Sequence, residues 1–159
     1  MDPRRLVPIQ GWPASGSDDA GRAVLGALAG LSAGLLVGVL FWLLGLFAAL
    51  SALVGAEGSS LGWALHLSLT TALGAGFGAL VVRDRYAGDA TTAALIGLWY
   101  GGSIWLVGEA LWTVAGGPTL ANLGLVSLIG WLLYGLALGW LTAVVGPRSL
   151  PLAASGSGV

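Results

Sequence analysis

Four long apolar stretches make up most of this chain and constrain its fold more than any other feature. They are residues 23–54, 61–82, 90–115 and 121–145. Each reaches the roughly 20 residues that an α-helix needs to cross the hydrocarbon core of a bilayer. The chain is 57% hydrophobic and 8% charged, a composition that would not keep a soluble domain of 159 residues in water. The sequence therefore predicts an integral membrane protein.

The connections between these stretches predict an all-α, up-down-up-down bundle of four membrane-spanning helices. Gly-Gly-Pro at 116–118 ends the third stretch, and the small and polar residues 55–60 separate the first two. Short connections of this kind make consecutive helices antiparallel neighbours. The first stretch is longer than a bilayer core of about 30 Å requires. We expect it to tilt, to bend near Gly45, or to leave its last turns at the membrane interface.

The positive charges predict the orientation of the chain. There are six arginines and no lysine, and all six fall on one side of the predicted topology: Arg4, Arg5 and Arg22 before the first helix, Arg83 and Arg85 between the second and third, and Arg148 after the fourth. Because cationic residues stay on the cytoplasmic face, both tails, 1–22 and 146–159, are expected in the cytoplasm. We expect a multi-pass protein of the cell (inner or plasma) membrane. A net charge of −1 offers no basic surface for nucleic acid.

The two halves of the chain repeat each other as two parallel helical hairpins. The segment Gly-Leu-Ser-Ala-Gly at 30–34 returns as Gly-Leu-Trp-Tyr-Gly at 97–101, and His66 with Gly74 matches Trp131 with Gly139. Glycines four residues apart form smooth grooves through which membrane helices approach closely. We expect such grooves to pack the bundle, with contacts to other subunits as the alternative, at Gly30, Gly34, Gly38, Gly74, Gly78, Gly97, Gly101, Gly135 and Gly139.

These repeated motifs resemble those of uncharacterised families of small four-helix membrane proteins from bacteria and halophilic archaea. The resemblance implies a Gly-His-x-x-Tyr-Gly signature in the last helix. Here that segment is Gly130-Trp131-Leu132-Leu133-Tyr134-Gly135, so a tryptophan stands at the histidine position. The resemblance covers the membrane portion and implies no particular activity.

His66 and Glu109 are the ionisable side chains, tyrosine aside, that lie well inside the predicted spans. A carboxylate in hydrocarbon is costly, so Glu109 is a candidate for a proton, ion or polar-ligand site. At 1.5 Å per residue, both lie about 8 to 9 Å below the predicted helix ends, where they could pair. The alternative is that His66 bonds to a backbone carbonyl and Glu109 reaches the headgroups. Without cysteine, and with two ligands at most, we expect no metal site.

Several aromatic residues lie deep in the predicted bundle. They could line a pocket for a quinone, carotenoid or lipid, or fill the space that glycine-rich helices leave open. These residues are Trp42, Trp99, Trp105, Trp131 and Tyr134.

No motif of a nucleotide-binding loop, a hydrolase or a catalytic acid pair is present, so we expect no enzymatic activity. The composition favours an accessory or structural subunit of a larger membrane complex, of a respiratory or photosynthetic type. One alternative is a small oligomeric transporter or channel for protons or cations, and another is a quinone or lipid binder. The expected partners are membrane lipids and other membrane subunits, or further copies of the chain. We expect no cofactor of its own, and leave open a lipid, quinone or pigment shared with neighbouring subunits.

Overall fold

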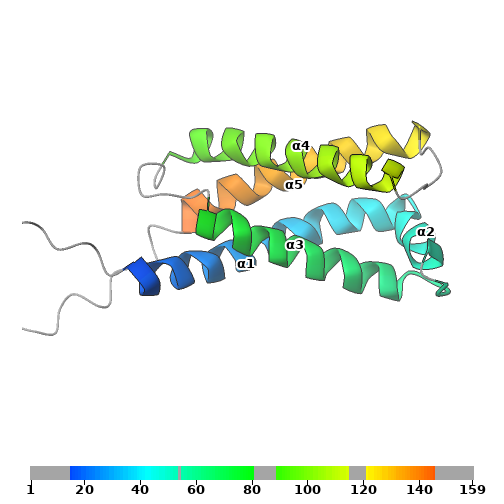
Figure 1. Cartoon of the computed structure of the whole chain (residues 1–159), viewed down its shortest axis with the longest axis horizontal. Helices are drawn as coiled ribbons and strands as arrows, with labels where there is room; N and C mark the ends of the chain where they lie inside the picture. The colour runs from blue at the N-terminus through cyan, green and yellow to red at the C-terminus, as the bar shows by residue number, and fades with distance from the viewer. Residues whose placement is uncertain (1–14, 54, 81–88, 115–120, 146–159) are drawn as a thin grey trace, which may run out of the picture.

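The computed structural model describes residues 15–53, 55–80, 89–114 and 121–145. They form five helices, α1 (Ser15–Leu43), α2 (Leu46–Leu53), α3 (Ser60–Leu80), α4 (Ala90–Val114) and α5 (Ala121–Val145). The four longer helices lie lengthwise beside one another, and the short α2 sits at one end (Figure 1). The described residues contain no strand, which confirms the all-α prediction.

Three of the described helices are long and apolar enough to cross a membrane, through the segments Asp19–Leu43, Ala90–Leu111 and Gly124–Val145. They indicate a membrane protein in contact with lipid. The 21-residue α3 is not among them, because polar residues such as His66 and Thr70 dilute its apolar run.

The first predicted span is interrupted, so it is not one helix over 23–54. Gly45 has a φ of +72°, in the left-handed region that favours glycine. Its backbone N–H bonds to the carbonyl of Trp42 at 2.9 Å, which closes the last turn of α1. The chain then turns into α2. The structure thus contains a bend near Gly45, which is one of the three alternatives for this long stretch.

The helix also begins earlier than the sequence indicated, at Ser15 and not at Ala23. Residues 15–22 of the predicted tail are therefore helical. Asp19 and Arg22 form an ion pair at 2.6 Å across one helical turn, and such a pair supports a helix outside the apolar stretch. The other arginines, the 116–118 turn, Ala115, Val81, Val82, residues 1–14 and the tail 146–159 lie outside the described residues.

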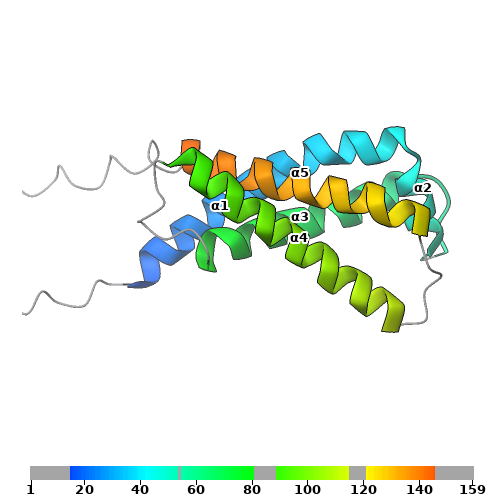
Figure 2. The same ribbon diagram turned by 90° about the horizontal axis from the view of Figure 1, so that it is seen from above.

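The helices pack as two close pairs, α1 with α3 and α4 with α5, and contacts between α1 and α5 join the pairs. Gly30 faces the Thr70 carbonyl and the Cα of Gly74, and Gly97 likewise faces Gly135 and Gly139. These contacts follow the spacing of the predicted repeat, which itself stays a prediction. Figure 2 shows the C-terminal half of α4 turning away from the rest of the bundle.

Every glycine predicted to pack lies against a neighbouring helix. A Cβ added at any of them would come within 3.0 Å of an atom of another helix, and most would meet a backbone carbonyl: Gly30, Gly34, Gly38, Gly74, Gly78, Gly97, Gly101, Gly135 and Gly139. The centre of the bundle is mainly apolar and is filled by large side chains that include Phe47, Phe77, Tyr134 and Leu138. The helices are thus held by close backbone contact at their edges and by aromatic packing at the centre.

Candidate functional site

His66 is buried and bonded to the backbone of α1. Its Nε2 lies 2.9 Å from the carbonyl oxygen of Gly34. Because a carbonyl can only accept, Nε2 carries the proton in this bond. The imidazole also packs among three aromatic rings, with centroid distances of 5.7 Å to Phe41, 5.2 Å to Phe47 and 6.4 Å to Trp63. This arrangement matches the structural alternative for His66, in which the ring bonds to a carbonyl and ties two helices together.

Two tyrosines make the same kind of bond from other helices. Tyr134 of α5 donates its hydroxyl to the carbonyl of Thr70 at 2.6 Å, and Tyr100 of α4 donates to the carbonyl of Leu73 at 2.9 Å. Both acceptors belong to α3. Since water is absent from a bilayer core, such bonds satisfy buried polar groups and fix the positions of helices relative to one another. The polar side chains at the centre thus fasten α3 to its three long neighbours.

Glu109 lies on α4, half-buried, with no hydrogen bond or ion pair from its carboxyl group to the rest of the described chain. Its backbone carbonyl accepts the hydroxyl of Thr113 at 2.8 Å. The hydrogen bond of His66 goes to Gly34, so the two candidate groups do not form the pair considered from the sequence. A carboxyl group at this depth without a partner is costly, which keeps Glu109 a candidate for an external contact.

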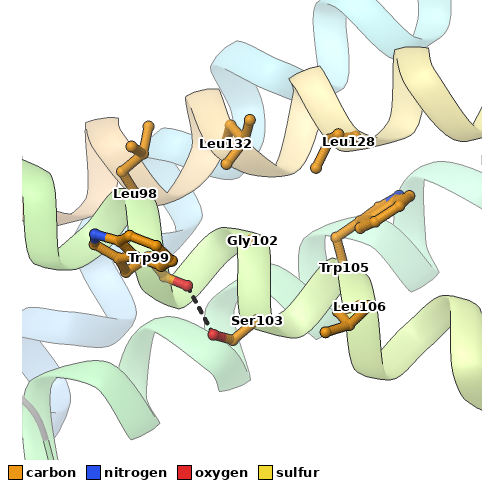
Figure 3. A pocket seen from close by; sticks show the side chains of 8 residues that line it. All are labelled: Leu98, Trp99, Gly102, Ser103, Trp105, Leu106, Leu128 and Leu132. Atoms are coloured by element: carbon orange, nitrogen blue, oxygen red, sulfur yellow. Dashed lines mark hydrogen bonds between the residues drawn. The ribbon is translucent and has the colours of Figure 1, made fainter.

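A groove lies between α4 and α5 (Figure 3). Its volume is 390 Å³, and its lining residues are Leu98, Trp99, Gly102, Ser103, Trp105, Leu106, Leu128 and Leu132. The indoles of Trp99 and Trp105 lie at its two ends, with Gly102 between them. The hydroxyl of Ser103 donates to the carbonyl of Trp99 at 2.8 Å, so it is already engaged within its own helix. The groove therefore presents mainly hydrocarbon and aromatic surface.

The five aromatic residues considered from the sequence do not share this groove. Trp99 and Trp105 line it, while Trp42 is exposed on α1. Trp131 and Tyr134 pack edge to face, with their ring centroids 5.5 Å apart, and Tyr134 is fully buried. The indole N–H of Trp105 is buried and has no hydrogen-bond partner in the part of the chain that the structure describes. An unpaired buried donor costs about 1–3 kcal/mol.

The structure adds residues that the sequence analysis did not single out. Gly26 faces Gly74 and Gly78. A Cβ added at Gly62 would lie 2.5 Å from the carbonyl oxygen of Phe47. Gly26 precedes Gly30 by four residues, so extending the glycine series backwards would have found it. Gly102 and Leu132 belong to the groove, and no sequence signal marks them as neighbours.

Among the residues that the structure describes, no three His, Cys, Asp or Glu side chains come together as a metal site would require. No family model, curated protein or solved structure matches this chain. The resemblance to small four-helix membrane families therefore stays a prediction.

Proposed function

We propose that the protein is a non-catalytic accessory subunit of a larger membrane complex, and that a partner helix packs against the C-terminal segment of α4, residues 106–114. The observation that carries this proposal is that α4 is the least covered of the long apolar helices. Only 17% of its apolar stretch is buried inside the molecule, against 44% in α1 and 39% in α5.

The C-terminal segment of α4 is exposed over much of its circumference. At 100° per residue, Leu106, Val107 and Gly108 together span about 200° of the helix, and all three are exposed, whereas Glu109 on the remaining side is half-buried. Leu111 is 65% exposed and Val114 is 86% exposed. α1, by contrast, alternates buried and exposed residues along its length, as expected for a helix with one covered face.

The path of α4 explains this exposure. Its first half is held to α5 through Gly97 and Gly101 and to α3 through Tyr100. Beyond this region it turns away from α5 (Figure 2). Membrane helices associate through close packing, so a segment that leaves its own bundle offers the surface that a helix of another subunit needs.

The membrane arrangement belongs to the same proposal. α3 lies against α1 along most of its length, from Gly78 beside Gly26 to Trp63 beside Gly38. A helix packed in this way against a membrane-spanning neighbour crosses the bilayer with it, which makes four spans. With Arg22 directly before the apolar stretch of α1, the positive-inside rule then puts the N-terminus in the cytoplasm, and four spans return the C-terminus there.

Proton or cation transport is the alternative that His66 and Glu109 suggested. The bond from His66 to Gly34, inside a ring of aromatic side chains, gives no support to a relay through both groups. Glu109 alone would have to carry the charge. The accessory-subunit proposal needs no such path.

Cross-linking in the native membrane tests the proposal. Because the chain has no cysteine, single-cysteine variants can be cross-linked without background from the chain itself. We expect Val107→Cys and Leu111→Cys to form a cross-linked product with one other membrane protein in fixed stoichiometry. Leu36→Cys, on the exposed face of α1, is the matched control and should form much less of that product.

Two results would count against the proposal. One is that Val107→Cys and Leu111→Cys cross-link no more than Leu36→Cys, which would mean that lipid covers α4. The other is that both positions link only to a second copy of the same chain, which would make the protein a homo-oligomer.

A further inference from the structure

We propose that the groove between α4 and α5 binds a quinone-type lipid, with its tail across Gly102 and an oxygen of its ring at Glu109. The site lies on the side of α4 that faces α5. Leu106 and Glu109 also belong to the segment 106–114 that the proposed partner contacts, but Glu109 lies on the opposite side of the helix from Val107 and Leu111.

The groove suits a flat, apolar molecule. Its volume of 390 Å³ falls within the range of about 300–1,000 Å³ that is typical of small-molecule sites. The indoles of Trp99 and Trp105 bound it at either end, and Gly102 leaves room between them (Figure 3). The Ser103 hydroxyl is engaged by the Trp99 carbonyl, so most of the ligand must be hydrocarbon or aromatic.

The position of the groove restricts the ligand to molecules that dissolve in the bilayer core. Gly102 lies midway between Ala90 and Val114, the ends of α4. If α4 spans the membrane, the groove lies at the midplane, where lipid headgroups do not reach. A phospholipid could therefore contribute only an acyl chain to it.

Glu109 lies about one turn beyond Trp105 and outside the lining of the groove, and it offers a polar group on the same stripe of the helix. Leu98, Gly102, Trp105 and Glu109 are spaced at four, three and four residues, which puts them on one helix face. Glu109 lies about 10.5 Å from Gly102 along the axis and about 7.5 Å below the end of α4. The carboxyl group there can form a hydrogen bond with a ring oxygen of the ligand, whereas an acyl chain or a pure hydrocarbon would leave it without a partner.

Saturable quenching of tryptophan fluorescence tests this binding. The purified full chain in lipid nanodiscs would be titrated with a decyl-substituted benzoquinone, which quenches indoles that it contacts. Gly102→Leu fills the floor of the groove, where an added Cβ already lies 3.4 Å from Leu132. We expect it to weaken binding at least about tenfold. Gly108→Leu is the matched control, because a Cβ there meets nothing within 4 Å.

Glu109 is tested separately. Glu109→Ala should weaken binding about five- to tenfold, whereas Glu109→Gln keeps an N–H donor and should bind nearly as the natural chain does. Equal affinity of the Gly102→Leu and Gly108→Leu proteins would overturn the site. Decylbenzene has the same tail as the quinone and no oxygen. If it displaces the quinone with an affinity equal to that of the quinone itself, the role of Glu109 is overturned and the groove is a site for plain hydrocarbon chains. Neither result bears on the cross-linking at Leu111.

Discussion

Replacing Gly97 by alanine should separate α4 from α5 and destabilise the protein. A Cβ at this position would lie 2.9 Å from the backbone nitrogen of Gly139 and 3.0 Å from the carbonyl carbon of Gly135, and closer still to the Gly135 oxygen. These neighbours are backbone atoms, which cannot rotate away as a flexible side chain does. The helices themselves must move.

The size of the effect follows from these distances. Ordinary van der Waals contact begins near 3.4 Å, and the Gly135 oxygen would lie more than about 1 Å inside that limit. α4 must therefore shift by more than about 1 Å, and a gap of about 1 Å already forfeits about half of the dispersion attraction between facing atoms. Overpacking of this kind costs about 1–3 kcal/mol. Alanine regains up to about 1 kcal/mol of helix propensity over glycine. We expect a net loss of about 0–2 kcal/mol in the free energy of unfolding, which is about 1–3 kcal/mol relative to a glycine-to-alanine change that meets no neighbour.

Unfolding by increasing mole fractions of SDS, followed by circular dichroism, measures this loss. Gly108→Ala and Gly124→Ala are the matched controls, because an added Cβ meets nothing within 4 Å at either position. The Gly97→Ala protein should unfold at a lower SDS fraction than both controls. Gly135→Ala should behave like Gly97→Ala. The double variant should lose less free energy of unfolding than the two single variants lose together, because one shift of the helices relieves both contacts. If Gly97→Ala unfolds together with Gly108→Ala, the close backbone contact does not hold this pair.

Three further predictions concern single contacts. Tyr134→Phe removes the bond to the Thr70 carbonyl and should lower the free energy of SDS unfolding by about 0.6 kcal/mol, and by no more than about 1.7 kcal/mol. Gly45→Ala forces a left-handed alanine and should cost about 1–2 kcal/mol in the same assay, and an unchanged midpoint would show that the bend is not strained. The hydrogen bonds from Thr92 lower the pKa of Asp89 below its ordinary 3.8, so this carboxylate caps α4 at neutral pH and loses the cap as the pH falls through that lowered value. Amide exchange at the start of α4 should therefore rise in strong acid, and Asp89→Ala should abolish that rise.

The helical segments were largely predictable because apolar length is a local property of the chain. The described helices α4 and α5 lie within the predicted stretches 90–115 and 121–145. The beginning of α1 was missed because hydropathy marks where a helix is apolar and not where it starts. Ser15 to Arg22 are polar and still helical, and an ion pair between Asp19 and Arg22 supports their first turns.

The candidate site was less predictable because it depends on which residues face one another. Depth alone allowed His66 and Glu109 to pair, yet the rotation of α3 turns His66 towards Gly34 of α1. The sequence suggested one shared pocket for the deep tryptophans. In the structure Trp99 and Trp105 line the groove, whereas Trp42 is exposed on α1.

The sequence by itself determined that this chain is helical and belongs in a membrane, because apolar length and the solvent preference of each residue are properties of single segments. It also indicated the glycines at which helices approach, because the positions that lack a side chain can be identified directly from the sequence. Only the tertiary structure decided that the C-terminal half of α4 diverges from α5 (Figure 2) and that a groove opens beside Gly102. Such features depend on the rotation and crossing of whole helices, which many side chains fix together and no local pattern encodes.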